Sequence, residues 1–365
     1  MTKGVLSCGS KKIALTGGGS AGHVTPIVTI IPELLARGYE LHYIGTARGI
    51  ERVIIKPLNI AYHPIPAGKL RRYFSIKNLT DIFRVIMGCY RSWRILSEIK
   101  PHVIFSKGGF VSVPVIAAAW LRRVPIVIHE SDMTPGLANR ISLPFVRKVC
   151  YTFPETAGYF PLDKRVLTGI PISPKLLQGD ADQGRKRCRF TDRKPVIMVI
   201  GGSLGSRVLN RIVRQSLSSL SERYQICHIC GNGNLDSSLD QMEGYCQFEF
   251  VDHENKMLAD LFAAADLVVS RAGATILFEL LSLAKPNLLI PLSKKASRGD
   301  QIRNARSFQK QGYSKILPEE DLTQDRLIDQ IEQLYRQREM FAERMKNRRR
   351  NKAVNKLIDV IEATA

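Results

Sequence analysis

Glycines followed by a histidine make residues 11–26 the first stretch of the chain that could do chemistry. A short apolar run at 13–15 leads into a glycine-rich turn, and a segment with helical prospects begins after His23. Glycine tolerates positive φ and lets a ligand approach the backbone, while the N–H groups and dipole of the next helix attract an anion. The stretch therefore predicts a strand, a turn and a helix around a phosphate group. The turn residues are Gly17, Gly18, Gly19, Ser20, Ala21 and Gly22.

One alternative is a dinucleotide site, because Gly17, Gly19 and Gly22 satisfy the pattern G-x-G-x-x-G. That pattern expects an acidic residue about 20 positions later, where it holds a ribose. Here the second predicted strand, 41–44, ends in glycine and threonine, and Glu40 stands at its start. The missing acid weakens the interpretation as a nicotinamide-dependent oxidoreductase.

A second glycine-rich turn follows another apolar run, at 195–200, and starts 184 positions after Gly17. Two similar α/β halves that face each other across a cleft suit a nucleotide-sugar transferase better than a dehydrogenase. The second turn consists of Gly201, Gly202, Ser203, Leu204, Gly205 and Ser206.

Polar and small residues also follow four other predicted strands. Because the carboxyl ends of parallel strands meet at one edge of a sheet, where ligands bind, we expect these residues to line the crevice. Taken alone, Glu279 reads as a solvated helix residue and Gln301 as a loop amide. The groups are Lys107, Gly108 and Gly109 after 103–106; His129, Glu130, Ser131 and Asp132 after 126–128; Arg271, Ala274 and Glu279 after 267–270; and Ser297 and Gln301 after 287–291.

The elements that must position these residues alternate between short strands and helical segments, which predicts an α/β fold with Rossmann-like, doubly wound parallel sheets. A length of 365 residues favours two domains. The pattern loosens between Pro161 and Pro195, so we place the boundary there, with the turn GIPISP (169–174) as hinge. We expect domains at 1–166 and 167–345.

The chain is strongly basic, with 54 Lys and Arg against 33 acids and a net charge of +21. Residues 1–166 hold 23 basic and 9 acidic side chains, net +14, which leaves +7 for the rest. The excess predicts an anionic partner such as a phosphorylated metabolite or an anionic bilayer; a solvated basic face is the alternative. No zinc spacing, RNA-binding sheet signature or basic heptad region is found, so we expect no nucleic-acid partner.

Aromatic and basic residues cluster at 68–77 and continue onto a predicted helix at 78–98. We expect most apolar side chains of that helix to face the core, and the alternative is an interfacial docking patch. The candidate patch contains Arg71, Arg72, Tyr73, Phe74 and Trp93.

No apolar run reaches the roughly 18 to 20 residues that a membrane span needs, and the N-terminus has no signal-peptide core, so we expect a cytoplasmic protein. The seven cysteines are an odd, scattered set that we read as reduced thiols. Cys227 and Cys230 form a C-x-x-C without a second pair nearby. No metal or cofactor is therefore expected.

Seven blocks occur in order along nearly the whole chain: TGGGSAGHVTP (16–26), YIGTARGIE (43–51), FSKGGFVSVP (105–114), HESDMTPGLANR (129–140), GGSLGSRVLN (201–210), SRAGATILFEL (270–280) and SRGDQIRNA (297–305). Together they resemble the MurG family, the N-acetylglucosaminyltransferases of peptidoglycan synthesis in glycosyltransferase family 28. The resemblance implies a GT-B fold and transfer of N-acetylglucosamine, with inversion, from UDP-N-acetylglucosamine to lipid I. It also implies a peripheral protein at the cytoplasmic face of an anionic cell membrane.

The resemblance implies that the final helix, about 346–365, returns to the N-terminal, acceptor-side domain, and that the C-terminal domain binds the donor. It assigns His23 as the base that deprotonates the acceptor hydroxyl; a helix-start histidine satisfied by backbone is the alternative. Expected donor contacts are Ser20, Ala21, Gly22, Ser203, Val251, Arg271, Ala274, Glu279 and Gln301. Candidate contacts of the acceptor or sugar are Gly19, Asp132, Lys107, Gly108 and Gly109.

The chain departs from the family pattern at Asp132, Leu204 and Ser173, which leaves open a related UDP-sugar transferase with another lipid or small-molecule acceptor. A noncatalytic basic membrane adaptor is a separate alternative. Replacement of His23 separates the enzyme from the adaptor.

Overall fold

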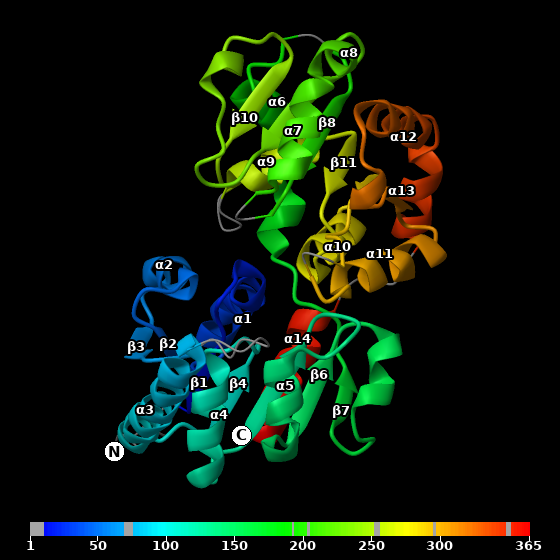
Figure 1. Ribbon diagram of the computed structural model, residues 1–365. Helices are drawn as coiled ribbons and strands as arrows, with labels where there is room; N and C mark the ends of the chain where they lie inside the picture. The colour runs from blue at the N-terminus through cyan, green and yellow to red at the C-terminus, as the bar shows by residue number, and fades with distance from the viewer. Residues whose placement is uncertain are drawn as a thin grey trace, which may run out of the picture. The chain divides into compact units, whose positions relative to one another are not determined.

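The computed structural model describes residues 11–68, 76–191, 193–202, 205–251, 256–294, 297–347 and 352–365 (Figure 1). The chain forms two compact units: Met1–Pro171 with Lys352–Ala365, and Ile172–Asn351. The first junction lies five residues beyond the expected end of the N-terminal domain at 166, and the returning segment starts at Lys352 instead of about 346.

The first unit contains a seven-stranded parallel sheet in the order β3-β2-β1-β4-β5-β6-β7. β1 lies beside both β2 and β4, with Thr16 paired to Ile44 and Ser106. The carboxyl ends of β1, β2 and β4 therefore lie at the same edge of the sheet. The strands are β1 (Lys12–Thr16), β2 (Glu40–Thr46), β3 (Ala61–Ile65), β4 (Val103–Ser106), β5 (Ile126–Glu130), β6 (Lys148–Tyr151) and β7 (Arg165–Leu167).

Helices cover both faces of this sheet. One core joins the sheet to α1 and to the C-terminal helix α14, whose Leu357, Ile358 and Ile361 are fully buried. Figure 1 shows α14, in red, against the sheet of the first unit. The opposite core contains Leu96 of α3 and Val115 of α4. The helices are α1 (Thr25–Ala36), α2 (Ile50–Ile55), α3 (Ile76–Ile99), α4 (Ser112–Leu121), α5 (Leu137–Ser142) and α14 (Ala353–Thr364), with 3-10 turns η1 (Ala21–His23), η2 (Lys56–Leu58), η3 (Leu143–Phe145) and η4 (Pro154–Tyr159).

The second unit contains a six-stranded parallel sheet in the order β10-β9-β8-β11-β12-β13. β8 and β11 are neighbours, and Ile200 pairs with Ser270 at their carboxyl ends. The second glycine turn and Arg271 therefore leave the sheet side by side. The strands are β8 (Val196–Ile200), β9 (Gln225–Ile229), β10 (Tyr245–Phe248), β11 (Leu267–Ser270), β12 (Asn287–Leu289) and β13 (Lys315–Ile316).

The stretch between Pro161 and Pro195, where we placed the domain boundary, contains α6 of the second unit. The Asp180 side chain caps this helix by accepting from the N–H groups of Asp182 and Gln183. A Cβ on Gly184 would collide with the Asp260 carbonyl oxygen on α9, so α6 and α9 pack at close range. The helices are α6 (Ala181–Arg187), α7 (Arg207–Gln215), α8 (Leu217–Ser221), α9 (Lys256–Ala264), α10 (Ala274–Ser282), α11 (Asp300–Lys310), α12 (Gln324–Arg336) and α13 (Arg338–Lys346), with 3-10 turns η5 (Pro174–Gln178), η6 (Ser237–Leu239) and η7 (Glu319–Asp321).

The fold prediction is confirmed: two parallel-sheet, Rossmann-like units make up the chain. Helix α1 continues through Pro32 to Ala36, so the proline does not shorten it. Among the described residues, no helix is both long and apolar enough to cross a bilayer. The six described cysteines are free thiols, and four of them are buried.

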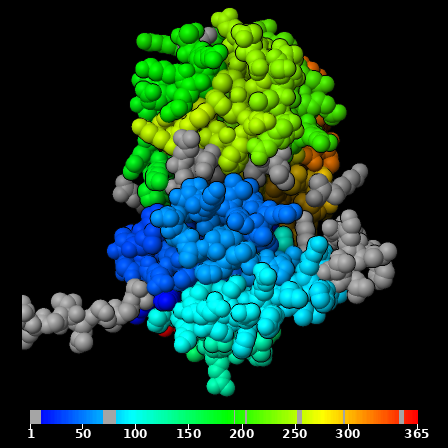
Figure 2. All heavy atoms as spheres, turned by 90° about the vertical axis from the view of Figure 1, so that its left-hand side faces the viewer, coloured from blue at the N-terminus to red at the C-terminus, as the bar shows by residue number. Residues whose placement is uncertain are grey.

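The expectation that most apolar residues of α3 face the core is wrong. Leu96 is buried, but Ile82, Phe83, Ile86 and Trp93 are exposed, with 66% of Phe83 and 62% of Ile86 open to solvent. Figure 2 shows α3, in cyan, along the surface of the first unit. Of the rest of the candidate patch, Arg71, Arg72, Tyr73 and Phe74 lie outside the described residues.

Candidate active site

The first glycine turn begins after β1 and is held by an aromatic side chain of β2. The Tyr43 hydroxyl donates a 2.7 Å hydrogen bond to the Gly17 carbonyl oxygen. The Tyr43 ring is fully buried and stacks on Tyr62, with ring centroids 5.7 Å apart. The turn then closes as η1, where the Ser20 carbonyl accepts a 3.2 Å hydrogen bond from His23 N–H. These contacts fix the turn relative to the sheet.

A buried carboxylate, Glu51 of α2, fills the inner side of this turn. Glu51 is 0% exposed. Its Oε2 accepts from Gly19 N–H at 3.3 Å, and its Oε1 accepts from Thr46 N–H at 3.0 Å and from the Thr46 hydroxyl. A Cβ on Gly18 would lie 2.7 Å from Glu51 Cδ, so glycine is needed for the carboxylate to approach. The anion bound at Gly19 is thus a side chain of the protein.

His23 ends η1 next to the turn that follows β4. Gly108 and Gly109 in that turn have φ angles of +87° and +83°, which favour glycine. A Cβ on Gly109 would collide with the Gly18 carbonyl oxygen and lie 3.2 Å from His23 Cδ2. His23 is partly exposed, as is Ala21, while Ser20 and Gly22 are exposed. The fold thus brings His23 and the two predicted turns of the first unit together.

Lys107 precedes those glycines but lies inside the unit, with 1% of its surface exposed. Its Nζ donates to the Ser131 hydroxyl. Burial lowers the pKa of Lys107 to about 8, and the charges of Glu130 and Asp132 oppose that shift. The side chain is therefore a buried cation that joins the ends of β4 and β5.

Glu130 is the acid of this cluster, and burial raises its pKa. Its carboxylate accepts from Asp132 N–H at 3.0 Å, Gly136 N–H at 2.9 Å and Asn139 Nδ2 at 2.8 Å. The neighbouring His129 bonds through Nε2 to the Gly169 carbonyl oxygen at 2.8 Å, and burial holds the pKa of His129 well below its usual value. Of the four residues predicted to follow the strand at 126–128, His129, Glu130 and Ser131 are buried and Asp132 has a partly exposed side chain.

In the second unit, the glycine turn after β8 leads into α7. Ser203 and Leu204 lie outside the described residues. Gly205 has a φ of +69°, and a Cβ there would collide with the Cys230 carbonyl oxygen. Ser206 caps α7, and its hydroxyl accepts from Leu209 N–H at 3.3 Å.

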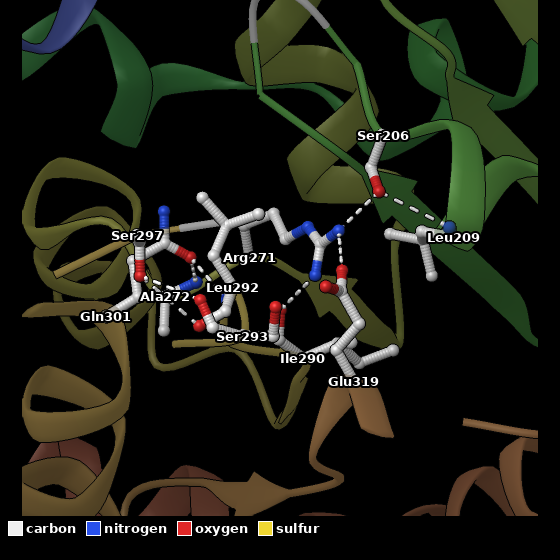
Figure 3. Close-up of polar contacts among 10 residues, drawn as sticks. All are labelled: Ser206, Leu209, Arg271, Ala272, Ile290, Leu292, Ser293, Ser297, Gln301 and Glu319. Atoms are coloured by element: carbon white, nitrogen blue, oxygen red, sulfur yellow. Dashed lines mark hydrogen bonds and ion pairs between the residues drawn. The ribbon is translucent and has the colours of Figure 1, made fainter. Parts of the chain in front are cut away.

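Arg271, which directly follows β11, connects three segments of the second unit (Figure 3). Its Nη1 donates to the Ile290 carbonyl oxygen at 3.0 Å. Its Nη2 donates to the Ser206 hydroxyl and to the Glu319 carboxylate. The Arg271 and Glu319 side chains are 8% and 13% exposed, so the ion pair is largely shielded from water. Arg271 thus braces the glycine turn through Ser206.

Gln301, the second residue of α11, lies beside Arg271 in Figure 3 and bridges two strand ends. Its Oε1 accepts from Ala272 N–H at 3.3 Å and from Leu292 N–H at 3.1 Å. Ala274 is the buried first residue of α10, and Glu279 is a buried residue of the same helix. Val251, which follows β10, is buried.

Comparison with protein families decides the identity of the chain. Residues 13–151 match the glycosyltransferase family 28 N-terminal domain, and residues 196–361 match the glycosyltransferase family 28 C-terminal domain. The chain belongs to glycosyltransferase family 28.

Relatives of this family-28 chain are similar over nearly its full length. A protein of Clostridium tetani is 52% identical, with 96% of this chain and 98% of the relative covered, and one of Clostridium novyi is 54% identical with the same coverage. Both are named UDP-N-acetylglucosamine--N-acetylmuramyl-(pentapeptide) pyrophosphoryl-undecaprenol N-acetylglucosamine transferase.

Solved structures support the fold. The crystal structure of MurG from Acinetobacter baumannii matches with a TM-score of 0.73 at 24% identity, over 97% of this chain and 99% of that one. A UDP-GlcNAc 2-epimerase from Neisseria meningitidis matches with a TM-score of 0.66 at 12% identity, over 97% of this chain and 100% of that one. With the two parallel sheets, these likenesses confirm the GT-B fold.

Three residues of this family-28 chain shape the glycine turns but were not assigned a role from sequence: Glu51, Ser206 and Glu319. Glu51 ends the block YIGTARGIE, and Ser206 closes the second turn, so motif position gave a signal for both. Glu319 stands in the acidic stretch Glu319, Glu320 and Asp321, where nothing in the sequence distinguishes it from its neighbours.

Proposed function

We propose that this protein transfers N-acetylglucosamine from UDP-N-acetylglucosamine to lipid I, undecaprenyl-pyrophosphoryl-N-acetylmuramoyl-pentapeptide, and so forms lipid II for peptidoglycan. The observation that carries the proposal is identity above 50%, over 96% of the chain, to relatives named for that activity. The first unit would hold the acceptor and the second unit the donor.

The donor proposal rests on the strand ends of the second unit. The N-termini of α7 and α10 follow the neighbouring strands β8 and β11, and their N–H groups can hold the diphosphate and stabilise the charge of the departing UDP. We place Ser203 at the diphosphate, Val251 at the uracil, Glu279 at the ribose and Ala274 at the sugar. Such a site needs no metal ion.

Gln301 has a specific proposed role at the sugar. The Ala272 and Leu292 N–H groups both donate to its Oε1, so the Nε2 group is the donor that this side chain offers to a sugar hydroxyl. Arg271 is proposed to act at the diphosphate end by bracing Ser206, because its Nη atoms bond to protein groups.

The acceptor proposal places His23 as the general base. It would take the proton from the muramoyl hydroxyl while that oxygen attacks the anomeric carbon and the bond to UDP breaks, which inverts that carbon. His23 is partly exposed and sits against the β4 turn with Gly109, so an acceptor can reach it. Ser20, Ala21 and Gly22 would contact the donor from this side, at the sugar that UDP itself lacks, and Gly19, Gly108 and Asp132 are proposed near the acceptor or sugar.

We propose that the exposed face of α3 docks on an anionic membrane at its cytoplasmic side. Arg122 lies over the Trp93 ring at 5.3 Å from the centroid, so a basic group and an aromatic group lie together on this surface. Binding to vesicles with and without anionic lipid tests the proposal. The exposed apolar residues of this patch are Ile82, Phe83, Ile86, Met87, Tyr90 and Trp93 on α3, and Trp120 and Leu121 at the end of α4.

Transfer itself is the test of the function. Purified protein is mixed with UDP-N-acetylglucosamine and a short-chain lipid I analogue, the product is weighed by mass spectrometry, and UDP-glucose is the control donor. We expect a disaccharide from the N-acetylated donor alone. Donor binding without sugar transfer to lipid I would contradict the acceptor assignment.

A further inference from the structure

Glu319 is an acid next to the phosphate end of the proposed donor site. It lies in η7, far along the chain from both glycine turns, and reaches Arg271 with its carboxylate. The same Nη2 of Arg271 donates to the Ser206 hydroxyl, the cap of α7 (Figure 3). The Arg271 guanidinium group therefore lies between the Glu319 carboxylate and the turn that would hold the diphosphate.

The guanidinium is not saturated by these contacts. Its Nε is buried and, within the part of the chain that the structure describes, makes no hydrogen bond. A buried N–H without a partner is costly, and an anion bound over the turn could satisfy it. Arg271 thus combines a bond to the α7 cap, a bond to the Ile290 carbonyl oxygen, an ion pair with Glu319 and a buried Nε–H without a partner.

We propose that Glu319 is an internal counter-anion that sets the affinity for the donor diphosphate by neutralising Arg271. The inference rests on the proposed donor site. A full cation beside a diphosphate would bind substrate and UDP product alike, and uniformly tight binding slows product release without raising the rate of the chemical step. A fixed carboxylate beside that cation reduces its attraction for phosphate, so UDP leaves more readily.

The direction in which UDP affinity changes distinguishes this role of Glu319 from one in which it only holds Arg271 in position. If Glu319 only held Arg271 in position, removing the carboxylate would loosen the α7 cap and weaken UDP binding. If Glu319 acts as counter-anion, removing its charge strengthens UDP binding, because Arg271 keeps its bonds to Ser206 and Ile290. The two roles therefore predict opposite shifts in the dissociation constant.

The experiment is calorimetric titration of the full chain with UDP, UMP and uridine. We expect Glu319→Gln to bind UDP roughly three- to tenfold more tightly than wild type, UMP with a smaller gain, and uridine unchanged, since a charge at this distance acts on phosphate alone. The gain should shrink as salt is added. Glu320→Gln is the matched control, because Glu320 is exposed in the same turn and its loss changes the net charge equally.

Glu319→Ser, which removes the charge and leaves room for water, must shift UDP affinity in the same direction, and thermal unfolding verifies that each variant is folded. Equal or weaker UDP binding by a folded Glu319 variant would overturn the inference, as would a gain that extends to uridine or occurs in Glu320→Gln. Wild-type protein that does not bind UDP would overturn the proposed donor site, and with it this role of Glu319.

Discussion

The two glycine turns of this protein share one pattern, a strand, glycines and a helix start, but they meet side chains of opposite charge. In the first unit the Glu51 carboxylate accepts a hydrogen bond from Gly19 N–H. In the second unit the Arg271 guanidinium donates to Ser206, which caps the helix after the turn. One turn contains an anion of the protein, and the other lies beside a cation.

The difference shows that a glycine motif alone does not specify its ligand. Glycines permit close approach of an anion in both turns, and the side chain that reaches the turn from another element decides which anion is favoured. Glu51 disfavours a phosphate at Gly19 by its charge. Arg271, even paired with Glu319, keeps a positive group beside the second turn.

The largest expected effect comes from removing the proposed base beside the first turn. We expect His23→Ala to lower kcat by about 10²- to 10⁴-fold, the usual contribution of a general base, while the Kd for UDP changes less than about twofold because UDP binds at the other turn. Steady-state transfer and calorimetry measure the two quantities.

His102→Ala is the matched control, since His102 lies exposed just before β4, at the opposite edge of the same sheet. Full turnover in His23→Ala, or a comparable loss in His102→Ala, would refute the assignment of His23.

The next prediction concerns Glu51, the carboxylate inside the first turn. In Glu51→Gln an NH₂ group replaces one carboxylate oxygen and faces the donors of either Gly19 or Thr46. We therefore expect kcat to fall roughly 10- to 100-fold through displacement of His23. The free energy of unfolding should fall by about 1–3 kcal/mol. UDP affinity should stay unchanged, and Glu33→Gln, at a partly exposed acid of α1, is the control. UDP binding that weakens along with turnover would mean that the first turn holds the donor.

A smaller effect is expected at the second turn. Ser206→Ala removes both the α7 cap and the acceptor for Arg271, so we expect a loss of about 1 kcal/mol in unfolding free energy and several-fold weaker UDP binding. Thr323→Ala removes the matching cap of α12, where Thr323 accepts from Arg326 N–H at 3.3 Å. It should cost similar stability and leave UDP binding intact. Equal UDP affinities in the two variants would argue against a role of Ser206 in donor binding.

The last prediction concerns stability alone, at the buried cation behind the β4 turn. Because burial lowers the pKa of Lys107 to about 8, the unfolded lysine binds a proton that the folded one has lost between about pH 8 and pH 10. Wild-type stability should therefore rise with pH in that window, relative to Lys107→Met, by at most about 1.4 kcal/mol per pH unit. Urea unfolding at both ends of the window measures it, with the exposed Lys100→Met as control. Parallel pH profiles for all three proteins would show that Lys107 stays charged.

Short apolar runs made the sheets predictable. The apolar runs at 103–106, 195–200 and 267–270 match β4, β8 and β11 to within one residue, because a buried parallel strand must be apolar on both faces. Polar elements were not predictable in this way: α6 reads as a linker since its cap and its packing on α9 depend on Asp180 and Gly184, not on apolar spacing. The exposed face of α3 looks like core in sequence because apolar periodicity does not say what covers a face.

The site was predictable where motifs lie on strand ends and unpredictable where a distant side chain completes it. Gly17, Arg271 and Gln301 could be placed at the carboxyl edges from topology alone. The contact of Glu319 with Arg271 joins residues 48 positions apart, and only the folded chain shows it.

Hydrogen exchange followed by mass spectrometry tests most directly whether UDP binds at the second turn and not at the first. Peptides that contain residues 13–24 and 205–210 are compared in the free protein and with saturating UDP, and His23→Ala serves as a folded, transfer-deficient reference. We expect UDP to slow exchange at 205–210 and at the start of α10, with 13–24 unchanged. If UDP slowed exchange at 13–24 and left exchange at 205–210 unchanged, the claim that UDP binds at the second turn and not at the first would be contradicted.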